Sequence, residues 1–139
     1  MENKVVAHLR EGRIVKGLTH DFDSRREVFH VLPAEGGGIP VRVRVSEMKA
    51  LFYVRDYIGN REYDPPPGFG VRADRGRRCV VTFYDGEVIF GSTPDYDADG
   101  RPSDSDALGF MLYPSDSDDN NVRIFVSSKA IKEIHFPES

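Results

Sequence analysis

An internal repeat constrains this chain more than any other feature of its sequence. Residues 6–23 align with residues 80–97 at a shift of 74. The identical pairs are Val6/Val80, Gly12/Gly86, Gly17/Gly91, Thr19/Thr93, Asp21/Asp95 and Asp23/Asp97. The match resumes with residues 29–33 over 110–114 and 42–46 over 123–127, both at a shift of 81, and with 48–51 over 131–134 at a shift of 83. A chain with this pattern contains two copies of one structural unit.

Each copy is predicted to form five short β-strands. Glu11-Gly12 follows the first strand of copy one, and Asp85-Gly86 follows that of copy two; an Asp-Gly pair between apolar runs is a strong hairpin signal. Gly17 and Gly91 lie inside the second strands, where a glycine usually marks a bulge or a sharp bend. The later strands are expected at residues 28–33, 40–46 and 49–54, and at 109–113, 122–127 and 131–136.

Five short, bent strands in each copy predict an all-β chain of two tandem five-stranded small barrels, Sm-like or SH3-like, related by internal duplication. The first barrel spans residues 1–55 and the second residues 79–139. Residues 56–78 contain three consecutive prolines and several arginines and are expected to form a linker or an extended arm. Units of roughly 60 residues are near the lower limit for independent stability, so we expect the two to pack together.

Composition excludes several classes of protein. Hydrophobic residues make up 39% of the chain and charged residues 30%, as in a globular protein. The net charge of −4 argues against a general electrostatic attachment to nucleic acid or to an anionic membrane. The single cysteine, Cys79, rules out an internal disulfide and is typical of a reducing compartment. Residues 1–10 contain no apolar h-region, and no apolar run approaches about 18 residues. Neither a signal peptide nor a spanning helix is therefore expected, and the predicted location is the cytoplasm.

The first 33 residues resemble the first half of an Sm domain. The shared pattern is a strand ending in Glu11-Gly12, a bent strand with Gly17 inside it, and then Asp21-Phe22-Asp23 before a third strand. The chain as a whole is similar to a bacterial family of such barrels of unknown function, some found beside PilZ or other signalling domains. Residues 48–56 carry this second resemblance, which implies the fold and brings no known activity.

The Sm resemblance does not extend to base recognition. RNA-binding Sm proteins hold a base with an Asn on the third strand and an Arg-Gly or Lys-Gly pair at the end of the fourth. Here residues 24–29 contain no Asn, and the fourth strands are followed by Ser46-Glu47 and Ser127-Ser128. The fold is therefore expected to carry over without that function.

The acidic loop 95–106 has the spacing of a calcium loop. Carboxylates occupy positions 1, 3, 5 and 12, with Gly100 at position 6 for the turn. The candidate ligands are Asp95, Asp97, Asp99 and Asp106. Pro102 stands at position 8, an Asp replaces the usual bidentate Glu, and no helices flank the loop. Because Asp also favours turns by bonding its own backbone, a solvated hairpin loop with no cofactor is the favoured interpretation, and calcium binding is the alternative.

An Arg-rich stretch before the second copy is a candidate phosphate-binding arm. Its candidate residues are Arg72, Arg75, Arg77 and Arg78, with Tyr57 as an aromatic neighbour. PilZ domains bind a cyclic dinucleotide through an Arg-x-x-x-Arg arm before a barrel, and the spacing of Arg72 and Arg75 differs from that motif. The alternative is a solvated arm or a salt-bridged surface between the copies.

The apolar segment 51–58 is the candidate protein interface. It includes Phe52 and Tyr53, and it lies where the first barrel is expected to end. If exposed, such a segment indicates an interaction site or the seam between the two copies. The alternative is that it packs in the cores of the two barrels.

No enzyme is predicted. The four histidines show no metal-ligand spacing, and Cys79 is interpreted as a small core residue. The leading hypothesis is a non-enzymatic binding or adaptor module that engages another protein in bacterial regulation, with strand addition as a suitable mode. The alternative is a nucleotide or nucleic-acid binder, Sm-like or PilZ-like, that takes RNA or a cyclic dinucleotide on the Arg-rich arm.

Overall fold

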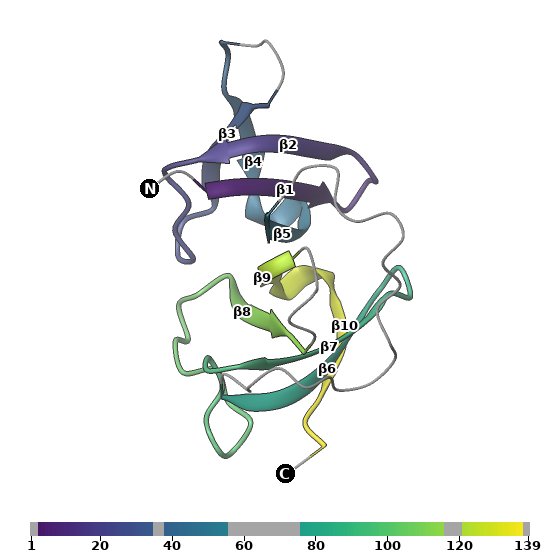
Figure 1. The fold of residues 1–139 in the computed structure, drawn as a ribbon. Helices are drawn as coiled ribbons and strands as arrows, with labels where there is room; N and C mark the ends of the chain where they lie inside the picture. Colours follow the sequence, from purple (N-terminus) through teal and green to yellow (C-terminus); the bar gives the residue numbers. More distant parts are fainter. Residues whose placement is uncertain (1–2, 35–37, 56–75, 116–120, 138–139) are drawn as a thin grey trace.

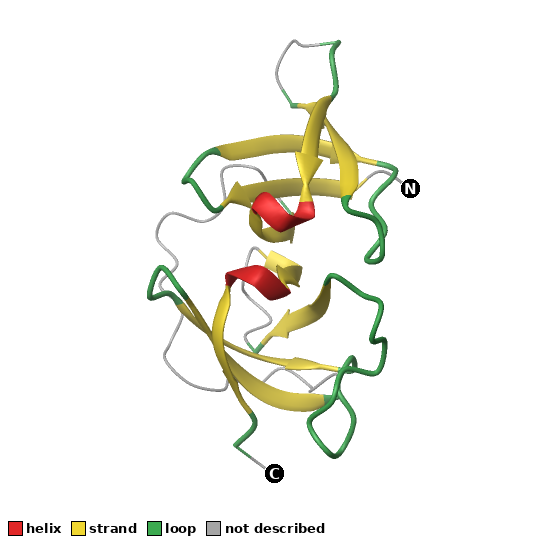
Figure 2. Ribbon diagram, turned by 180° about the vertical axis from the view of Figure 1, so that it is seen from behind, coloured by secondary structure: helices red, strands yellow, loops and turns green. Residues whose placement is uncertain are grey.

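The computed structural model describes residues 3–34, 38–55, 76–115 and 121–137, and in these residues the chain is all-β (Figures 1 and 2). The strands are β1 (Asn3–Leu9), β2 (Ile14–Thr19), β3 (Val28–Pro33), β4 (Val41–Arg44), β5 (Met48–Val54), β6 (Arg77–Phe83), β7 (Val88–Thr93), β8 (Gly109–Pro114), β9 (Asn121–Ser127) and β10 (Ile131–His135). Two 3-10 turns, η1 (Val45–Glu47) and η2 (Ser128–Ala130), precede β5 and β10. The prediction of an all-β chain is confirmed.

The ten strands form one open antiparallel sheet. Its order is β10-β6-β7-β8-β9-β5-β1-β2-β3-β4, so each half contributes five neighbouring strands. The two halves join where β5 pairs with β9, and Figure 1 shows these two strands between an upper and a lower half. The expected packing of the two copies against each other is confirmed, whereas two separate barrels are not.

The two halves repeat one pairing register. Val5 pairs with Gly17 in the first half, and Cys79 pairs with Gly91 in the second, which confirms the shift of 74 for the first two strands. A bulge interrupts β1–β5 and recurs at the equivalent place in β6–β10. The sequence repeat is therefore a repeat of backbone hydrogen bonding.

The fourth strands correct one part of the predicted alignment. Val43 pairs with Phe29, and Val126 pairs with Phe110, so β4 and β9 correspond at a shift of 83. The predicted shift of 81 was wrong by two residues. Strand side chains alternate with a period of two, so this slip keeps every side chain on the same face and leaves the apolar pattern unchanged.

Shared aspartates and threonines tie the loop after the second strand to the third strand. Asp21 Oδ1 accepts the backbone N–H of His30 at 2.9 Å, and Asp95 Oδ2 accepts that of Met111 at 2.8 Å. Thr19 and Thr93, just before these loops, are both buried. The residues that the two copies share at these positions therefore maintain the fold.

Two apolar cores share the seam strands. Alternate residues of β5 enter different cores: Phe52 packs with the second half, while Leu51 packs with the first. Phe125 on β9 crosses in the other direction and packs in the core of the first half. A strand buried on both faces needs a nearly continuous apolar run, which explains the composition of β5.

Candidate binding groove at the junction of the two halves

An open groove of about 940 Å³ lies where the two halves meet. One side is formed by the end of β1 and its following turn, and the other by the end of β6 and its following turn. The lining residues are His8–Arg13, Glu47, Lys49, Phe83–Asp85 and Ala130. Because the two turns are equivalent in the repeat, the junction brings corresponding parts of both copies to one site.

Lys49 is a partly buried cation at this site. Its side chain is 13% exposed and its Nζ lies 2.7 Å from Asp85 Oδ2, in contact with Glu87 and 4.7 Å from the centre of the Phe83 ring. Burial opposes the charge of Lys49, but the hydrogen bonds to both carboxylates outweigh it and raise its pKa. The hydrogen bond from Lys49 lowers the pKa of Asp85. This ion pair links β5 of the first half to the β6–β7 turn of the second.

His8 provides an uncharged ring beside Lys49. Its ring lies 4.5 Å from that of Phe52, centre to centre. Burial and the nearby charge of Lys49 lower the pKa of His8, so the ring is neutral at neutral pH. A neutral imidazole offers one donor and one acceptor to a bound group.

The rim of the groove is aromatic and of mixed charge. Tyr84 is 68% exposed, although its backbone N–H bonds Ala130 O at 3.1 Å. On the opposite side, Arg10 Nη1 donates to Ser46 O at 3.3 Å. Arg13 pairs with the exposed Glu11 at 3.5 Å. An exposed tyrosine and two arginines around one groove have the composition of a binding surface.

Lys49→Met is expected to lower the free energy of unfolding by about 1 kcal/mol, because it removes the ion pair and the cation–π contact while keeping the apolar stem. Chemical denaturation at neutral pH measures the loss. Lys132→Met is the matched control, since Lys132 holds the equivalent place on β10 and is exposed, and it should leave stability unchanged.

The deficit should also depend on pH in a defined direction. Because folding lowers the pKa of Asp85, its ion pair stabilises the folded chain fully above pH 3.8, the ordinary pKa of the carboxyl. This stabilisation is lost as the pH falls through the lower pKa that Asp85 has in the folded chain. The difference between Lys49→Met and the native chain should therefore shrink in strong acid. A difference that grows in acid would contradict this account.

The predicted interface residues on β5 are buried. Phe52 is 7% exposed and Tyr53 is 8% exposed, and they pair with Ile124 and Arg123 across the seam. The Arg123 guanidinium lies 4.3 Å from the centre of the Tyr53 ring. The expected exposure is therefore wrong for these two residues, which lie at the seam between the copies and pack in the two cores.

The Arg-rich arm is described only at its end. Tyr57, Arg72 and Arg75 lie outside the described residues. Arg77 and Arg78 belong to strand β6, although the predicted linker extended to residue 78. Arg77 Nη1 donates to Asp97 O at 2.8 Å, and its guanidinium lies 4.1 Å from the centre of the Phe136 ring. These contacts give Arg77 a structural role in holding the acidic loop.

The acidic loop uses its described carboxylates mainly to bond backbone N–H groups. Asp97 Oδ1 accepts the N–H groups of Asp99 and Arg101 at 2.9 and 3.0 Å, and Gly100 has a φ of 78°, as a tight turn requires. Asp95 bonds β8, and Asp106 donates its own N–H to Asp104 at 3.0 Å. No three His, Cys, Asp or Glu side chains in the described part of the chain are grouped to hold a metal ion. Calcium binding stays a prediction.

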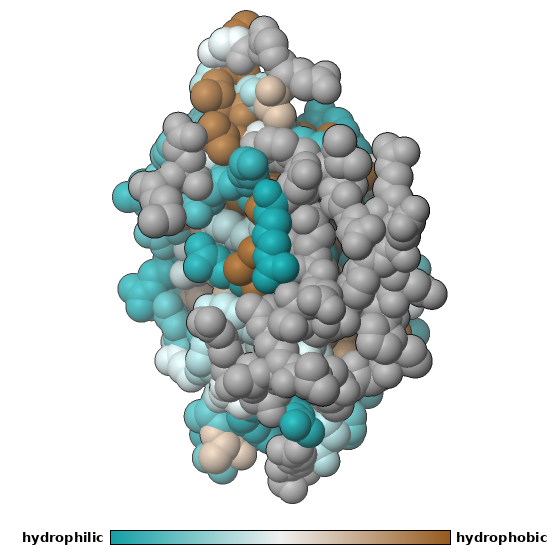
Figure 3. All heavy atoms as spheres, in the orientation of Figure 1, coloured by the Kyte–Doolittle hydropathy of each residue, from teal (hydrophilic) through white to brown (hydrophobic). Residues whose placement is uncertain are grey.

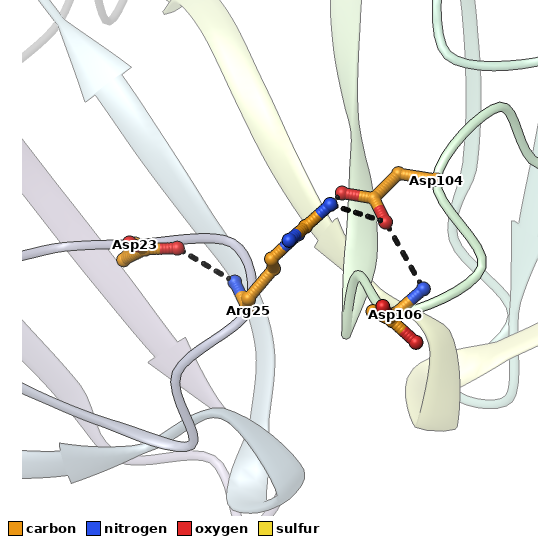
Figure 4. A network of polar contacts seen from close by, with 4 residues as sticks. All are labelled: Asp23, Arg25, Asp104 and Asp106. Carbon is orange, nitrogen blue, oxygen red and sulfur yellow. Dashed lines mark hydrogen bonds and ion pairs between the residues drawn. The ribbon is translucent and has the colours of Figure 1, made fainter.

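A second contact between the halves lies at this loop (Figure 4). Arg25 Nε donates to Asp104 Oδ2 at 2.9 Å, and Nη2 donates to Oδ1 at 3.3 Å. Asp23 Oδ1 holds the turn by accepting the backbone N–H of Arg25 at 2.9 Å. The Arg25 hydrogen bonds lower the pKa of Asp104. Both partners are substantially exposed, so this bridge orients the loops more than it stabilises the fold.

Sequence reasoning did not single out the groove residues. The sequence feature that could have identified them is a difference between the two copies, since Arg10 aligns with Tyr84 and Arg13 with Glu87. The residues that the two copies share instead support turns and contacts between strands. The junction itself was not visible because it depends on how β5 meets β9.

One family model matches the chain: its description is "Family of unknown function (DUF6982)", and it covers residues 1–136. No curated protein matches the sequence, and no solved structure matches the fold. In the described part of the chain, no helix is long and apolar enough to cross a membrane.

Proposed function

The chain belongs to the family of unknown function DUF6982, and from that premise we propose that it is a non-enzymatic binding module that holds a segment of a partner protein in the junction groove. The observation that carries this proposal is the groove itself, an open site of about 940 Å³ lined by both halves. Neither half alone supplies both sides of it. A site assembled by the duplication is a reason for the two copies to be fused.

The chemistry of the groove favours a protein segment over a small substrate. Tyr84 offers a large exposed ring, Arg10 and Arg13 offer charged donors, and Glu47 offers an acceptor. Burial raises the pKa of the Cys79 thiol to about 12, so this thiol stays protonated and inert. Neutral His8 and the paired Lys49 are suited to hydrogen bonding and packing. This combination supports binding without catalysis. As a separate proposal, we place the protein in the cytoplasm.

Tyr84→Ala is expected to reduce recovery of the partner at least tenfold when the tagged full-length chain is used for affinity capture from its native cells. An aromatic side chain that a partner covers on binding, as Tyr84 would be if a segment fills the groove, typically contributes about 2 kcal/mol to binding. Val88→Ala is the control, because Val88 lies on the same hairpin, is 47% exposed and does not line the groove. Equal recovery with both variants would count against the groove.

A nucleotide or nucleic-acid ligand is the second candidate function. Residues 1–55 contain ten basic and seven acidic residues, whereas residues 79–139 contain four basic and twelve acidic residues. The positive charge is thus concentrated in the first half and in the Arg-rich arm. Binding of RNA or a cyclic dinucleotide should weaken steeply as salt rises, while binding of a protein segment in the groove should change little. A titration at two ionic strengths separates the two.

We also propose that each half is a curled unit of the Sm-like or SH3-like kind, with the two units fused edge to edge. The repeated strand order and register support this, as do Gly17 and Gly91, where the backbone of the third strand leaves no room for a side chain. The duplication then supplies one extended sheet with two unequal ends.

A further inference from the structure

We propose that the outer edge of β4 binds an extended strand of a partner protein in which apolar and acidic side chains alternate. This edge adjoins the junction groove at Glu47, which Arg44 contacts, but the proposal does not depend on the function proposed for the groove. The argument rests on the backbone of β4, on the equivalent strand of the second half, and on the charges of the exposed arginines.

The backbone of β4 presents an open hydrogen-bonding edge. β4 is the last strand of the sheet, and no other described strand pairs with its outer side. Val45 N donates to Glu27 O at 2.8 Å, on the β3 side. Because N–H groups alternate in direction along a strand, those of Arg42 and Arg44 point outward. In Figure 2, β4 runs down the front of the upper half into η1.

The second half shows what this edge accepts. β9 is the equivalent strand, and its outer edge is occupied by β5 in antiparallel pairing, with Ala50 opposite Val126 and Phe52 opposite Ile124. Val126 corresponds to Val43 of β4 in the repeated register. The same backbone geometry therefore already takes an added antiparallel strand within this chain.

The side chains of β4 specify a different strand from β5. Phe125 of β9 is buried under the first half, whereas its equivalent, Arg42, is exposed. Arg42 makes no ion pair with another described residue, and Arg44 lies 3.7 Å from the exposed Glu47. An added strand would meet two valines on one face and two arginines on the other. Cross-strand neighbours of opposite charge stabilise a pair, so acidic residues suit the arginine face and apolar residues the valine face.

Exposed apolar residues near this edge add to the site. Ile39 is 81% exposed and Leu32 is 37% exposed, and both flank the tip of the β3–β4 hairpin. Brown, hydrophobic spheres mark this tip at the top of Figure 3. A partner strand longer than β4 gains apolar contact there.

A second copy of this chain is a poor occupant. At the other end of the sheet the last described strand is β10, and the register of the internal seam would place Ile134 opposite Arg42 and Glu133 opposite Val43. Lys132 would then face Arg44. Each side chain lies on the wrong face, and two cations meet, so the sheet is not expected to extend by self-association.

The test uses a fluorescein-labelled peptide, TVEVEVT, and its charge-reversed control, TVKVKVT, in anisotropy titrations of the full-length chain. The native chain should bind the Glu peptide at least tenfold more tightly than the Lys peptide. The double variant Arg42→Glu with Arg44→Glu should reverse the preference. Equal affinity of both peptides for the native chain, or an unchanged preference in the double variant, would overturn the proposal.

A backbone variant distinguishes strand addition from simple charge attraction. Arg42→Pro removes an outward N–H without removing a bond to β3, whereas Arg42→Ala removes only the charge. Thermal melting checks that both fold. Arg42→Pro should bind the Glu peptide at least threefold more weakly than Arg42→Ala, and equal binding would contradict strand addition.

Two further measurements isolate this site. The Tyr84→Ala variant should bind the Glu peptide as tightly as the native chain does. The edge proposal is therefore tested independently of the groove proposal. Weaker binding by Tyr84→Ala would count against an edge site distinct from the groove. Sedimentation of the native chain should show no concentration-dependent growth. Growth that Arg42→Pro abolishes would identify the occupant as a second copy and overturn the assignment.

Discussion

Phe125→Ala is expected to lower the free energy of unfolding by about 3–5 kcal/mol, the usual cost of emptying a buried aromatic site. Phe125 is 1% exposed, pairs with Leu51 across the seam and lies 4.8 Å from the ring of Phe22, centre to centre, in an edge-on contact. Its ring belongs to the core of the first half although its strand belongs to the second. The substitution therefore removes apolar contact where the halves depend on each other.

Denaturant unfolding of the native chain and of the Phe125→Ala variant tests whether the two halves unfold together. Because the seam strands supply both cores, we expect the native chain to unfold in one transition seen equally by circular dichroism and by tyrosine fluorescence. The variant should unfold at lower denaturant. Arg42→Ala, at the equivalent position of β4, is the matched control and should leave stability within about 0.5 kcal/mol of native. A small effect of Phe125→Ala, or two separate native transitions, would show that the halves are independent.

Gly17→Ala is expected to destabilise the chain by about 3 kcal/mol or more, through steric overlap in a tightly packed sheet. A Cβ at Gly17 would lie 2.0 Å from Leu32 O and 2.7 Å from Leu32 C. These are backbone atoms of β3, which is paired with β2 at this point. The overlap can be relieved only by separating the two strands, which breaks their pairing.

Two other glycine substitutions provide comparisons for Gly17→Ala, one at the equivalent position of the second half and one at a glycine without close neighbours. Gly91→Ala should act in the same direction, because its Cβ would lie 2.5 Å from Tyr113 O. Gly38→Ala is the control, since no atom of the described residues lies within 4 Å of its Cβ position. Midpoints of denaturant unfolding measure all three. Similar midpoints for Gly17→Ala and Gly38→Ala would mean that β2 and β3 are not held at this separation.

Local signals determined much of the fold in advance. The glycines within the second strands, the Gly12 and Gly86 turns and the alternation of apolar residues act between near neighbours in sequence, so the strands were predicted within two residues at most boundaries. Alternation could not fix the alignment of the fourth strands, because a slip of two residues preserves it. The calcium-like spacing of the acidic loop was equally ambiguous, since Asp bonds to turn backbone with the same spacing.

The sequence by itself determined that this chain is two copies of one five-stranded unit, because turns, bends and strand periodicity are encoded locally. Only the tertiary structure decided that β5 pairs with β9, which buried Phe52 and Tyr53 instead of exposing them. It also decided that Lys49 meets Asp85 beside a groove and that β4 is the last of the described strands in the sheet. These features arise from pairing between residues distant in the chain, and their energies depend on neighbours that the local sequence does not specify.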